Sequence, residues 1–330
     1  MRVGGSVILG AMSSKVSVVG AGHVGSAVAN ALVLLRVCDQ VVLYDRNAAR
    51  AEGEAWDIAD AIPLLAEMEI APTADYADLR GSDVVVVTAG AAGVPGQSRL
   101  DLLGTNAGIT AEVVHELDRV TPDATVVLAS NPVDVLTRVA VETSTRPAHR
   151  IMGSGTVLDG ARLRQRLGKL LDVEREDVHA YVIGEHGDSS FPVWSSATVG
   201  AIALENYPQP EHTSLPELQD ELAAATRQRG MRILERKGYT SYGVAAAVAR
   251  IVRAIVRDEK RIFMVSVPAA EEYGIGGVVL SVPCVVGRAG VERQLVLSMS
   301  QDEQQMLQRS AAILDTAYRS LAARAGSPPG

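Results

Sequence analysis

Covalent cross-links are the first feature that this sequence lacks. Only two cysteines, Cys38 and Cys284, occur among its 330 residues. Two thiols provide neither the disulfide framework of a small secreted domain nor a cysteine-rich metal cluster. We therefore expect no metal site, and a protein that works in the reducing environment of the cytoplasm.

Positive charge is also scarce, because 31 Lys and Arg stand against 39 Asp and Glu, for a formal net charge of −8 at pH 7. Binding to nucleic acid requires a basic surface, so this balance argues against nucleic acid as the main partner. An anionic substrate has to be bound by a few individual arginines.

Long apolar runs are missing as well. No run reaches the length of a membrane-spanning helix, so no membrane partner is expected. The stretch VGGSVILGAM at residues 3–12 resembles a weak secretory signal, with one Arg before a short apolar core. We favour the alternative of a disordered leader over residues 1–13, and we expect the C-terminal GSPPG to be disordered too.

The chain does contain short Val-rich runs that alternate with helical patterns. The runs KVSVVG, QVVLYD, DVVVVTAG and ATVVLASNP begin at residues 15, 40, 83 and 124. Continuous β-branched strands separated by helices are typical of a parallel sheet that is covered on both faces. Residues 14–153 are therefore predicted to form a doubly wound α/β domain.

The pattern changes after residue 153. A helix over GARLRQRLGKLL is followed by a strand and loop at VHAYVIGEHGD, and then by a long helical stretch from residue 215. A β-rich region from residue 261 and a final helix complete the chain. This order predicts an α+β second domain over residues 154–330. Because no linker separates the two domains, we expect a packed interface that holds a ligand cleft.

The motif GAGHVG, residues 20–25, follows the first strand and opens a helix. Its glycines allow a tight turn and the close approach of a pyrophosphate to the helix N-terminus. Asp45 ends the next strand, where a carboxylate can bind both ribose hydroxyls and would repel a 2′-phosphate. We therefore expect NAD rather than NADP, with Arg46 next to it as a point against. A glycine-rich turn beside a surface Asp is the alternative.

His186 lies in the acidic, glycine-flanked stretch GEHGDSS. By itself it would be read as an ordinary loop residue, but histidine can carry a proton near neutral pH. Asp159 and Arg162 are three residues apart and so share one face of a helix. A buried Asp beside the imidazole would raise its pKa, and an Arg could hold a carboxylate by two hydrogen bonds. A solvated salt bridge on the helix surface is the alternative.

Seven motifs then occur in an order that is typical of one family. They are GAGHVG, YDRN, TAGAAGVPGQSRLDLLGTN, ASNPVDVLT, GSGTVLDGARLR, GEHGDSSFPVWS and KGYTSYG. Together they resemble the L-lactate dehydrogenase and lactate-dehydrogenase-like malate dehydrogenase family, and most of all its bacterial L-lactate dehydrogenases, from about Lys15 to near Ala323. The resemblance implies a Rossmann NAD-binding domain followed by an α+β substrate domain.

The resemblance also implies a role for each matching residue. His186 corresponds to the proton donor and acceptor, Asp159 to its carboxylate partner, and Arg162 to the residue that binds the substrate carboxylate. Arg99 corresponds to the mobile-loop arginine that polarises the reacting carbonyl, and Thr240 lies beside the substrate side chain. Asn131 contacts both substrate and nicotinamide. The implied cofactor-binding residues are Gly20, Gly22, His23, Val24, Gly25, Asp45, Arg46, Thr88, Ala89, Gly90, Asn106, Ser130, Asn131 and Val244.

The expected substrate depends on Gly93, in the loop AAGVPGQSR. Family members that act on lactate usually have a glutamine here, and those that act on malate an arginine. No other basic residue precedes Arg99 in the loop, so the second carboxylate of malate would go unpaired. Thr240 is also more lactate-like. Pyruvate and L-lactate are therefore the first expectation. A bulkier branched-chain or aromatic 2-hydroxy acid, using the room that the glycine leaves, is the second, and malate the third.

Arg164 and His179 match two positions that bind fructose bisphosphate at a subunit interface in allosteric bacterial members of the family. Arg164 is two residues past Arg162 and so points away from the active-site face. We expect an effector site here and, with it, a homotetramer. Two exposed basic residues without an effector, and a dimer, are the alternatives.

Two other classes of protein are less well supported. An NAD-binding protein without turnover would keep the glycines and lose His186, Arg162 or Arg99, all of which are present. A Rossmann methyltransferase, or another nucleotide binder, would not need the His–Asp–Arg set of the second half. The sequence therefore favours an NAD-dependent L-2-hydroxy acid dehydrogenase that serves glycolysis or fermentation.

Overall fold

The computed structural model describes residues 13–65, 67–91, 99–208 and 214–325. The leader expected over residues 1–13 falls almost wholly outside these ranges. The expected C-terminal tail and Gly93 lie outside them as well.

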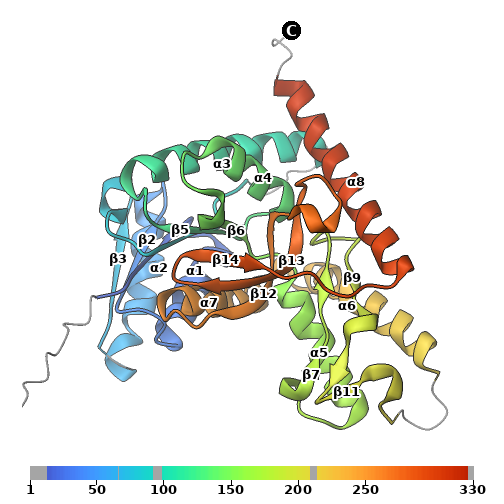
Figure 1. Ribbon diagram of the computed structural model, residues 1–330. Helices are drawn as coiled ribbons and strands as arrows, with labels where there is room; N and C mark the ends of the chain where they lie inside the picture. The colour runs from blue at the N-terminus through green and yellow to red at the C-terminus, as the bar shows by residue number, and fades with distance from the viewer. Residues whose placement is uncertain (1–12, 66, 92–98, 209–213, 326–330) are drawn as a thin grey trace, which may run out of the picture.

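One sheet runs through the middle of the molecule (Figure 1). Six of its strands are parallel and lie in the order β3-β2-β1-β4-β5-β6. This is the strand order of a doubly wound dinucleotide-binding domain, and it confirms the fold predicted for the first half of the chain. The strands are β1 (Lys15–Val19), β2 (Gln40–Tyr44), β3 (Glu69–Thr73), β4 (Val84–Val87), β5 (Thr125–Leu128) and β6 (Ile151–Gly153).

The Val-rich runs become strands because branched side chains fit a sheet that is covered on both faces. Every residue of β4 and of β5 is buried. The sequence analysis did not predict β3 and β6. β3 lies at the sheet edge, where Pro72 and partly exposed side chains are tolerated and leave no Val-rich pattern. β6 is only three residues long.

Helices cover both faces of this sheet (Figure 1). α3 and α4 lie on one face, and α1, α2 and α7 lie on the other. α1 and α7 pack against each other although they are far apart in the chain. The final helix, α8, packs on α3, α4 and β13. The bounds are α1 (His23–Leu34), α2 (Ala48–Ala59), α3 (Arg99–Val120), α4 (Val133–Thr143), α7 (Tyr242–Val256) and α8 (Gln301–Ala325).

The sheet continues into the second half of the chain. β12 pairs with β6 in the antiparallel sense at Ser266 and Gly153, and β13 and β14 extend the sheet further. Strands of both halves contribute to one hydrophobic core. The predicted β-rich region is therefore present, but it completes the sheet of the first half and does not form a separate one. The three strands are β12 (Arg261–Pro268), β13 (Val279–Gly287) and β14 (Gly290–Gln294).

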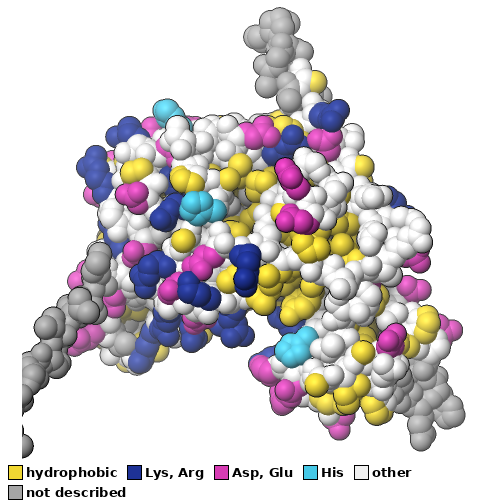
Figure 2. Space-filling view, in the orientation of Figure 1, with side chains coloured by type: hydrophobic (Ala, Val, Ile, Leu, Met, Phe, Trp, Pro, Cys, Tyr) yellow, Lys and Arg dark blue, Asp and Glu magenta, His cyan; other side chains and the backbone are white. Residues whose placement is uncertain are grey.

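A smaller lobe projects from this body (Figures 1 and 2). It has a core of its own between α5, α6 and short strands, to which Leu163, Leu167, Leu218 and Leu222 belong. The elements between β6 and α7 are α5 (Val157–Leu171), β7 (Val178–His179), β8 (Val182–Ile183), β9 (Phe191–Pro192), β10 (Thr198–Val199), β11 (Ile202–Ala203) and α6 (Leu215–Lys237).

Local sequence sets both ends of α6. The Ser214 side chain accepts a hydrogen bond from the Glu217 N–H, which satisfies a free donor of the first turn. Gly238 ends the helix with a left-handed φ of 84°, a conformation that costs glycine little. The long helical stretch predicted after residue 215 is therefore two helices, and the turn between them brings Thr240 to the edge of a cavity.

The small core of the projecting lobe makes a specific stability prediction. Leu167 is 1% exposed, so Leu167→Ala should lower the free energy of unfolding by about 2–5 kcal/mol through lost burial and a residual cavity. Lys169→Ala on the exposed face of the same helix should change it by no more than about 0.5 kcal/mol. Urea unfolding followed by circular dichroism measures both. Equal effects of the two substitutions would contradict a packed core in this lobe.

Candidate active site

A cavity of about 400 Å³ opens where the smaller lobe meets the carboxyl ends of the parallel strands. Its wall combines residues that follow β5 and β6 with residues of α1, α5, α6 and α7. Ligands of doubly wound sheets bind at this edge of the sheet. The interface expected from the sequence therefore does contain a cleft.

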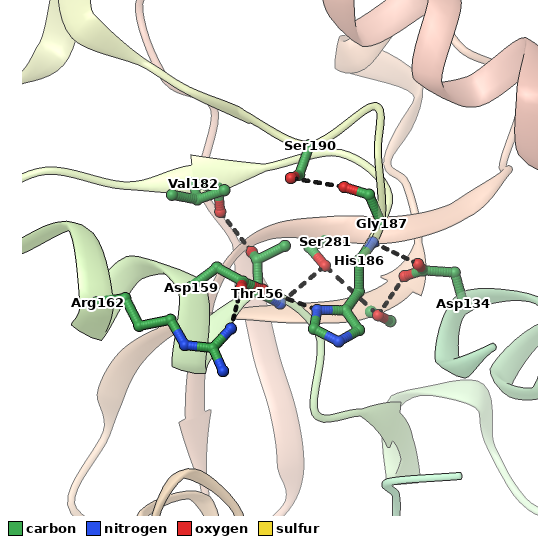
Figure 3. A network of polar contacts seen from close by, with 10 residues as sticks. Asp134, Thr156, Asp159, Arg162, Val182, His186, Gly187, Ser190 and Ser281 are labelled. Atoms are coloured by element: carbon green, nitrogen blue, oxygen red, sulfur yellow. Dashed lines mark hydrogen bonds and ion pairs between the residues drawn. The ribbon is translucent and has the colours of Figure 1, made fainter. Parts of the chain in front are cut away.

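Two segments far apart in the chain bring His186 and Asp159 together in this cavity (Figure 3). The loop after β8 carries His186, whose Nδ1 lies 2.7 Å from Oδ2 of Asp159 on α5. The other carboxylate oxygen of Asp159 accepts a hydrogen bond of 3.0 Å from Nη1 of Arg162. The Asp159 side chain is 8% exposed and that of His186 is 28% exposed. The imidazole can thus reach the cavity through Nε2 while Nδ1 is held from behind.

The environment of the pair favours its charged form. Burial opposes protonation of His186, but the hydrogen bond and the negative charge of Asp159 outweigh it, and the pKa of His186 is raised. Burial likewise works against the charge of Asp159, yet His186 and Arg162 hold the pKa of its carboxyl below the usual value. Imidazolium and carboxylate therefore stabilise each other, which suits a histidine that delivers a proton near neutral pH.

The structure places three of the expected substrate-binding residues on the cavity wall. Arg162, Asn131 and Thr240 line it together with His186. Arg99 is the first residue of α3, and the structure describes its backbone but not its side chain. Gly93, on which the expected substrate depends, also lies outside the described residues.

One face of α6 forms a part of the wall that the sequence reasoning missed. Arg227, Met231 and Leu234 recur at helical spacing and all line the cavity. Nη1 of Arg227 also donates to the carbonyl of Ser190, at 3.3 Å, in the loop that carries His186. The spacing was visible in the sequence, but nothing local indicated which face of this helix would turn toward His186.

The glycine-rich turn has the geometry that a dinucleotide requires. Gly20 has a φ of 104°, which favours glycine, and a Cβ at Gly25 would lie 1.7 Å from the carbonyl oxygen of Gly20. α1 begins directly after Gly22, and no side chain caps its free N–H groups. These backbone donors and the helix dipole fit a pyrophosphate.

The acidic residue of the motif lies beside this turn. Oδ2 of Asp45 accepts a hydrogen bond of 2.8 Å from the Ala21 N–H, so its carboxylate is held at the glycine-rich turn. Arg46 is exposed next to it. The position of Asp45 fits a carboxylate that binds ribose hydroxyls.

The remaining residues expected at the cofactor follow β4 and β5 or line the cavity. Thr88 donates its hydroxyl to the carbonyl of Gly20, and Ser130 donates its hydroxyl to that of Ala89. The Asn106 side chain accepts a hydrogen bond from the N–H of Ala91, directly after Gly90, and contacts the carbonyl of Asn131. Val24 and Val244 give the cavity an apolar wall. Hydrogen bonds of Thr88, Ser130 and Asn106 therefore join the glycine-rich turn to the segments after β4 and β5, and Asn131 extends this connection to the cavity of His186.

An aromatic contact joins the glycine-rich turn to the loop between α6 and α7. The rings of His23 and Tyr239 stack with centroids 3.9 Å apart and planes 12° from parallel. Lys237 lies over the rings of both Tyr239 and Tyr242. The sequence named His23 from its motif but had no signal for its partner, because the two residues meet only in the folded chain.

Two further observations concern the described part of the chain. It holds no group of three or more His, Cys, Asp or Glu side chains arranged to bind a metal ion. Nor does any of its helices combine the length and the apolar character needed to cross a bilayer.

The two residues expected to bind an effector lie in the smaller lobe. Arg164 is half-buried on α5 and forms no hydrogen bond or ion pair with another described residue. Burial lowers the pKa of its guanidinium, and the charge of nearby Arg261 lowers it further. His179 is exposed on β7. The negative charge of Glu176 acts in the opposite direction on Arg164, so this position combines two arginines with one nearby carboxylate.

Comparison with protein families accounts for nearly the whole chain. Residues 14–153 match the lactate/malate dehydrogenase NAD binding domain, and residues 156–324 match the lactate/malate dehydrogenase alpha/beta C-terminal domain. Among curated relatives, an L-lactate dehydrogenase of Thermus aquaticus is 44% identical over 308 residues, which is 93% of this chain and 99% of the relative. An L-lactate dehydrogenase of Nitratidesulfovibrio vulgaris (strain DP4) is 42% identical over 302 residues, or 91% and 97% of the two chains.

Two solved structures are similar to this chain over nearly its whole length. The minor L-lactate dehydrogenase of Enterococcus mundtii matches with a TM-score of 0.89 and 36% identity, covering 93% of this chain and 98% of that one. The malate dehydrogenase of Picrophilus torridus matches with a TM-score of 0.87 and 32% identity, covering 94% and 98%. The glycine turn, the buried His–Asp pair and both family matches lead to one conclusion: this chain belongs to the lactate/malate dehydrogenase family of NAD-binding oxidoreductases.

Proposed function

We propose that the protein is an NAD-dependent L-2-hydroxy acid dehydrogenase that interconverts pyruvate and L-lactate. The observation that carries the proposal is the buried pair of Asp159 and His186 beside Arg162, in a cavity that also receives the N-terminal part of α1. This arrangement offers a proton, a carboxylate-binding cation and a cofactor site at one place.

His186 supplies the proton in the reduction of the 2-oxo acid. A bound NADH supplies the hydride to the carbonyl carbon. As the carbonyl oxygen gains charge, the Nε2–H of His186 transfers a proton to it and yields the hydroxyl. Asp159 keeps the remaining Nδ1–H fixed and stabilises the imidazolium before transfer. In the reverse direction, the neutral imidazole accepts the proton of the hydroxyl.

Two arginines take part in substrate binding. Arg162 uses Nη1 to hold Asp159, and the rest of its guanidinium is available to the substrate carboxylate in the cavity. Arg99, at the start of α3, polarises the reacting carbonyl, which is the role that the family resemblance implies. Asn131 and Thr240 line the same cavity and are assigned contacts with the substrate.

The preference for pyruvate rests on Thr240 and on the curated relatives that are named L-lactate dehydrogenases. Met231 and Leu234 add apolar surface at the mouth of the cavity, which suits a substrate without a second charge. Arg227 adds a positive charge to the cavity wall, a position that the sequence did not predict. Its guanidinium already donates one hydrogen bond, to the carbonyl of Ser190. Oxaloacetate therefore belongs in any substrate comparison.

We also infer a homotetramer that works in the cytoplasm and is activated by fructose bisphosphate. Both cysteines are buried and free, which fits a reducing compartment. Arg164, with Arg261 near it and His179 on the same lobe, offers positive charge to a phosphate across a two-fold axis. Lactate formation of this kind regenerates NAD in glycolysis and fermentation.

The first experiment follows NADH oxidation at 340 nm with pyruvate, oxaloacetate, 2-oxoisocaproate and phenylpyruvate. We expect pyruvate to give the highest kcat/KM. His186→Asn should lower kcat by about 10²–10⁴-fold, because it removes the proton donor, and should leave NADH binding intact. His115→Asn, at an exposed position on α3, is the matched control and should be neutral. If kcat/KM is higher with the bulky acids than with pyruvate, one of these acids and not pyruvate is the preferred substrate. Full activity of His186→Asn would refute the mechanism.

The dependence on pH follows from the raised pKa of His186. Pyruvate reduction needs the imidazolium, so kcat/KM for pyruvate should fall as the pH rises through that pKa. Lactate oxidation needs the neutral imidazole, so kcat/KM for lactate should rise over the same range. Asp159→Asn removes the charge that raises the pKa, so the fall should move to lower pH by roughly one unit or more. Asp172→Asn, at the left-handed C-cap of α5, should leave the profile unchanged. An unshifted profile in Asp159→Asn would show that Asp159 does not tune the histidine.

The effector proposal has its own test. Fructose bisphosphate should lower the KM for pyruvate of the wild-type protein, and Arg164→Gln should abolish this response without changing the basal activity. Arg175→Gln, a surface arginine in the same lobe, serves as the control. A pyruvate saturation curve that does not change with the effector would exclude regulation at this position.

A further inference from the structure

A second carboxylate lies directly behind His186. Asp134 is in the first turn of α4 and is 2% exposed. Its Oδ2 accepts a hydrogen bond of 2.7 Å from the backbone N–H of His186 (Figure 3). Its Oδ1 accepts the hydroxyl hydrogen of Ser266 on β12. Asp134 therefore holds the peptide unit from which the catalytic imidazole extends.

No lysine or arginine among the described residues forms an ion pair with Asp134. The carboxylate is held instead by one N–H and one hydroxyl donor. A buried carboxylate without a cation is costly, and burial accordingly raises the pKa of Asp134 to about 6 against the opposing effect of these two hydrogen bonds. The imidazolium of His186 is the nearby positive charge that would compensate it.

The network behind Asp134 reaches the other elements that build the site (Figure 3). The hydroxyl of Ser266 lies 3.5 Å from that of Ser281 on β13. Oγ of Ser281 accepts a hydrogen bond from the N–H of Thr156, whose own hydroxyl donates to the carbonyl of Val182. Thr156 directly precedes α5, the helix that carries Asp159. Buried hydrogen bonds thus run from the Asp134 carboxylate to the residue that directly precedes the helix of Asp159.

We propose that Asp134 is a positioning residue for proton transfer, which fixes the backbone of His186 and presents a second negative charge to its imidazolium. This inference rests on the proposed function. It assigns the proton donor two carboxylates with different contacts, since Asp159 binds the ring and Asp134 binds the main chain.

The charges around His186 come from three elements. Asp159 and Arg162 face it from α5, Asp134 faces it from α4, and Glu185 precedes it in its own loop. Both aspartates raise the pKa of His186, and Arg162 lowers it. Removal of the negative charge at Asp134 should therefore make the imidazolium a stronger acid, even if the hydrogen bond to the backbone is kept.

Asp134→Asn separates charge from hydrogen bonding, because the amide oxygen can still accept from the His186 N–H. We expect the pKa of His186 to fall by roughly 0.5–1 unit. An NMR titration of the imidazole measures this, with the resonance assigned by its absence from His186→Asn. We also expect kcat/KM for pyruvate reduction at pH values above this pKa to fall roughly 3- to 10-fold, because a smaller fraction of His186 carries the proton, with NADH affinity unchanged.

Asp118→Asn is the matched control. Asp118 also accepts several hydrogen bonds, from Ser144, Thr145 and Arg146, but none of these residues lines the cavity. Asp118→Asn should lower the free energy of unfolding and leave the pKa of His186 unchanged. If Asp134→Asn does not fold, Ser266→Ala replaces it. That substitution removes the donor to Oδ1 of Asp134, and the pKa of this carboxyl should rise further. Less negative charge then faces the imidazolium, so the pKa of His186 should shift in the same direction by a smaller amount.

The NMR titration distinguishes failure of this inference from failure of the proposed function. A pKa of His186 that stays within roughly 0.2 unit in folded Asp134→Asn, or in Ser266→Ala, would overturn the role of Asp134 whatever the substrate. An inactive wild-type protein in which the shift still occurs would support the role of Asp134 and reject pyruvate reduction.

Discussion

The site depends on one buried interaction, the contact between the imidazole of His186 and the carboxylate of Asp159. A carboxylate that is taken out of water loses several kcal/mol of hydration, and only well-placed donors compensate for it. Asp159 has two such donors, one from the histidine ring and one from Arg162. Because these groups come from a loop and a helix, the fold has to hold the two segments in a fixed relation, and much of the second half of the chain serves this purpose.

The loop that carries His186 is held by four elements that are far apart in the chain, α4, α6, β13 and α8. β13 pairs with Gly184 at its start, Ser310 of α8 accepts from the N–H of Glu185, and Arg227 of α6 donates to the carbonyl of Ser190 at its end. Asp134 of α4 accepts a hydrogen bond from the backbone N–H of His186, in the middle of the loop. A glycine-flanked loop has little structure of its own, so these contacts supply the order that a proton donor needs. Of the strands that extend the sheet, β13 contacts this loop at Gly184, and β12 contacts Asp134 through Ser266.

Prediction from sequence succeeded where the relevant physics is local. The Val-rich strands, the turn at GAGHVG and the spacing of Asp159 and Arg162 each depend on neighbouring residues, and each occurs in the structure as expected. Prediction failed where contacts are distant in the chain. The edge strand β3 has no apolar pattern, the stack of His23 on Tyr239 joins residues from opposite halves, and the cavity-facing side of α6 is set only by packing.

The sequence by itself determined the four Val-rich strands, the glycine turn and the identity of the reactive side chains, because backbone sterics and the chemistry of single residues belong to short segments. The tertiary structure alone decided that Asp134 lies behind His186, that Arg227 reaches the cavity, and that the strands from both halves form one sheet. Burial and hydrogen bonding between distant segments produce these features. They exist only when the whole chain has closed around the cavity, and no short stretch of sequence encodes them.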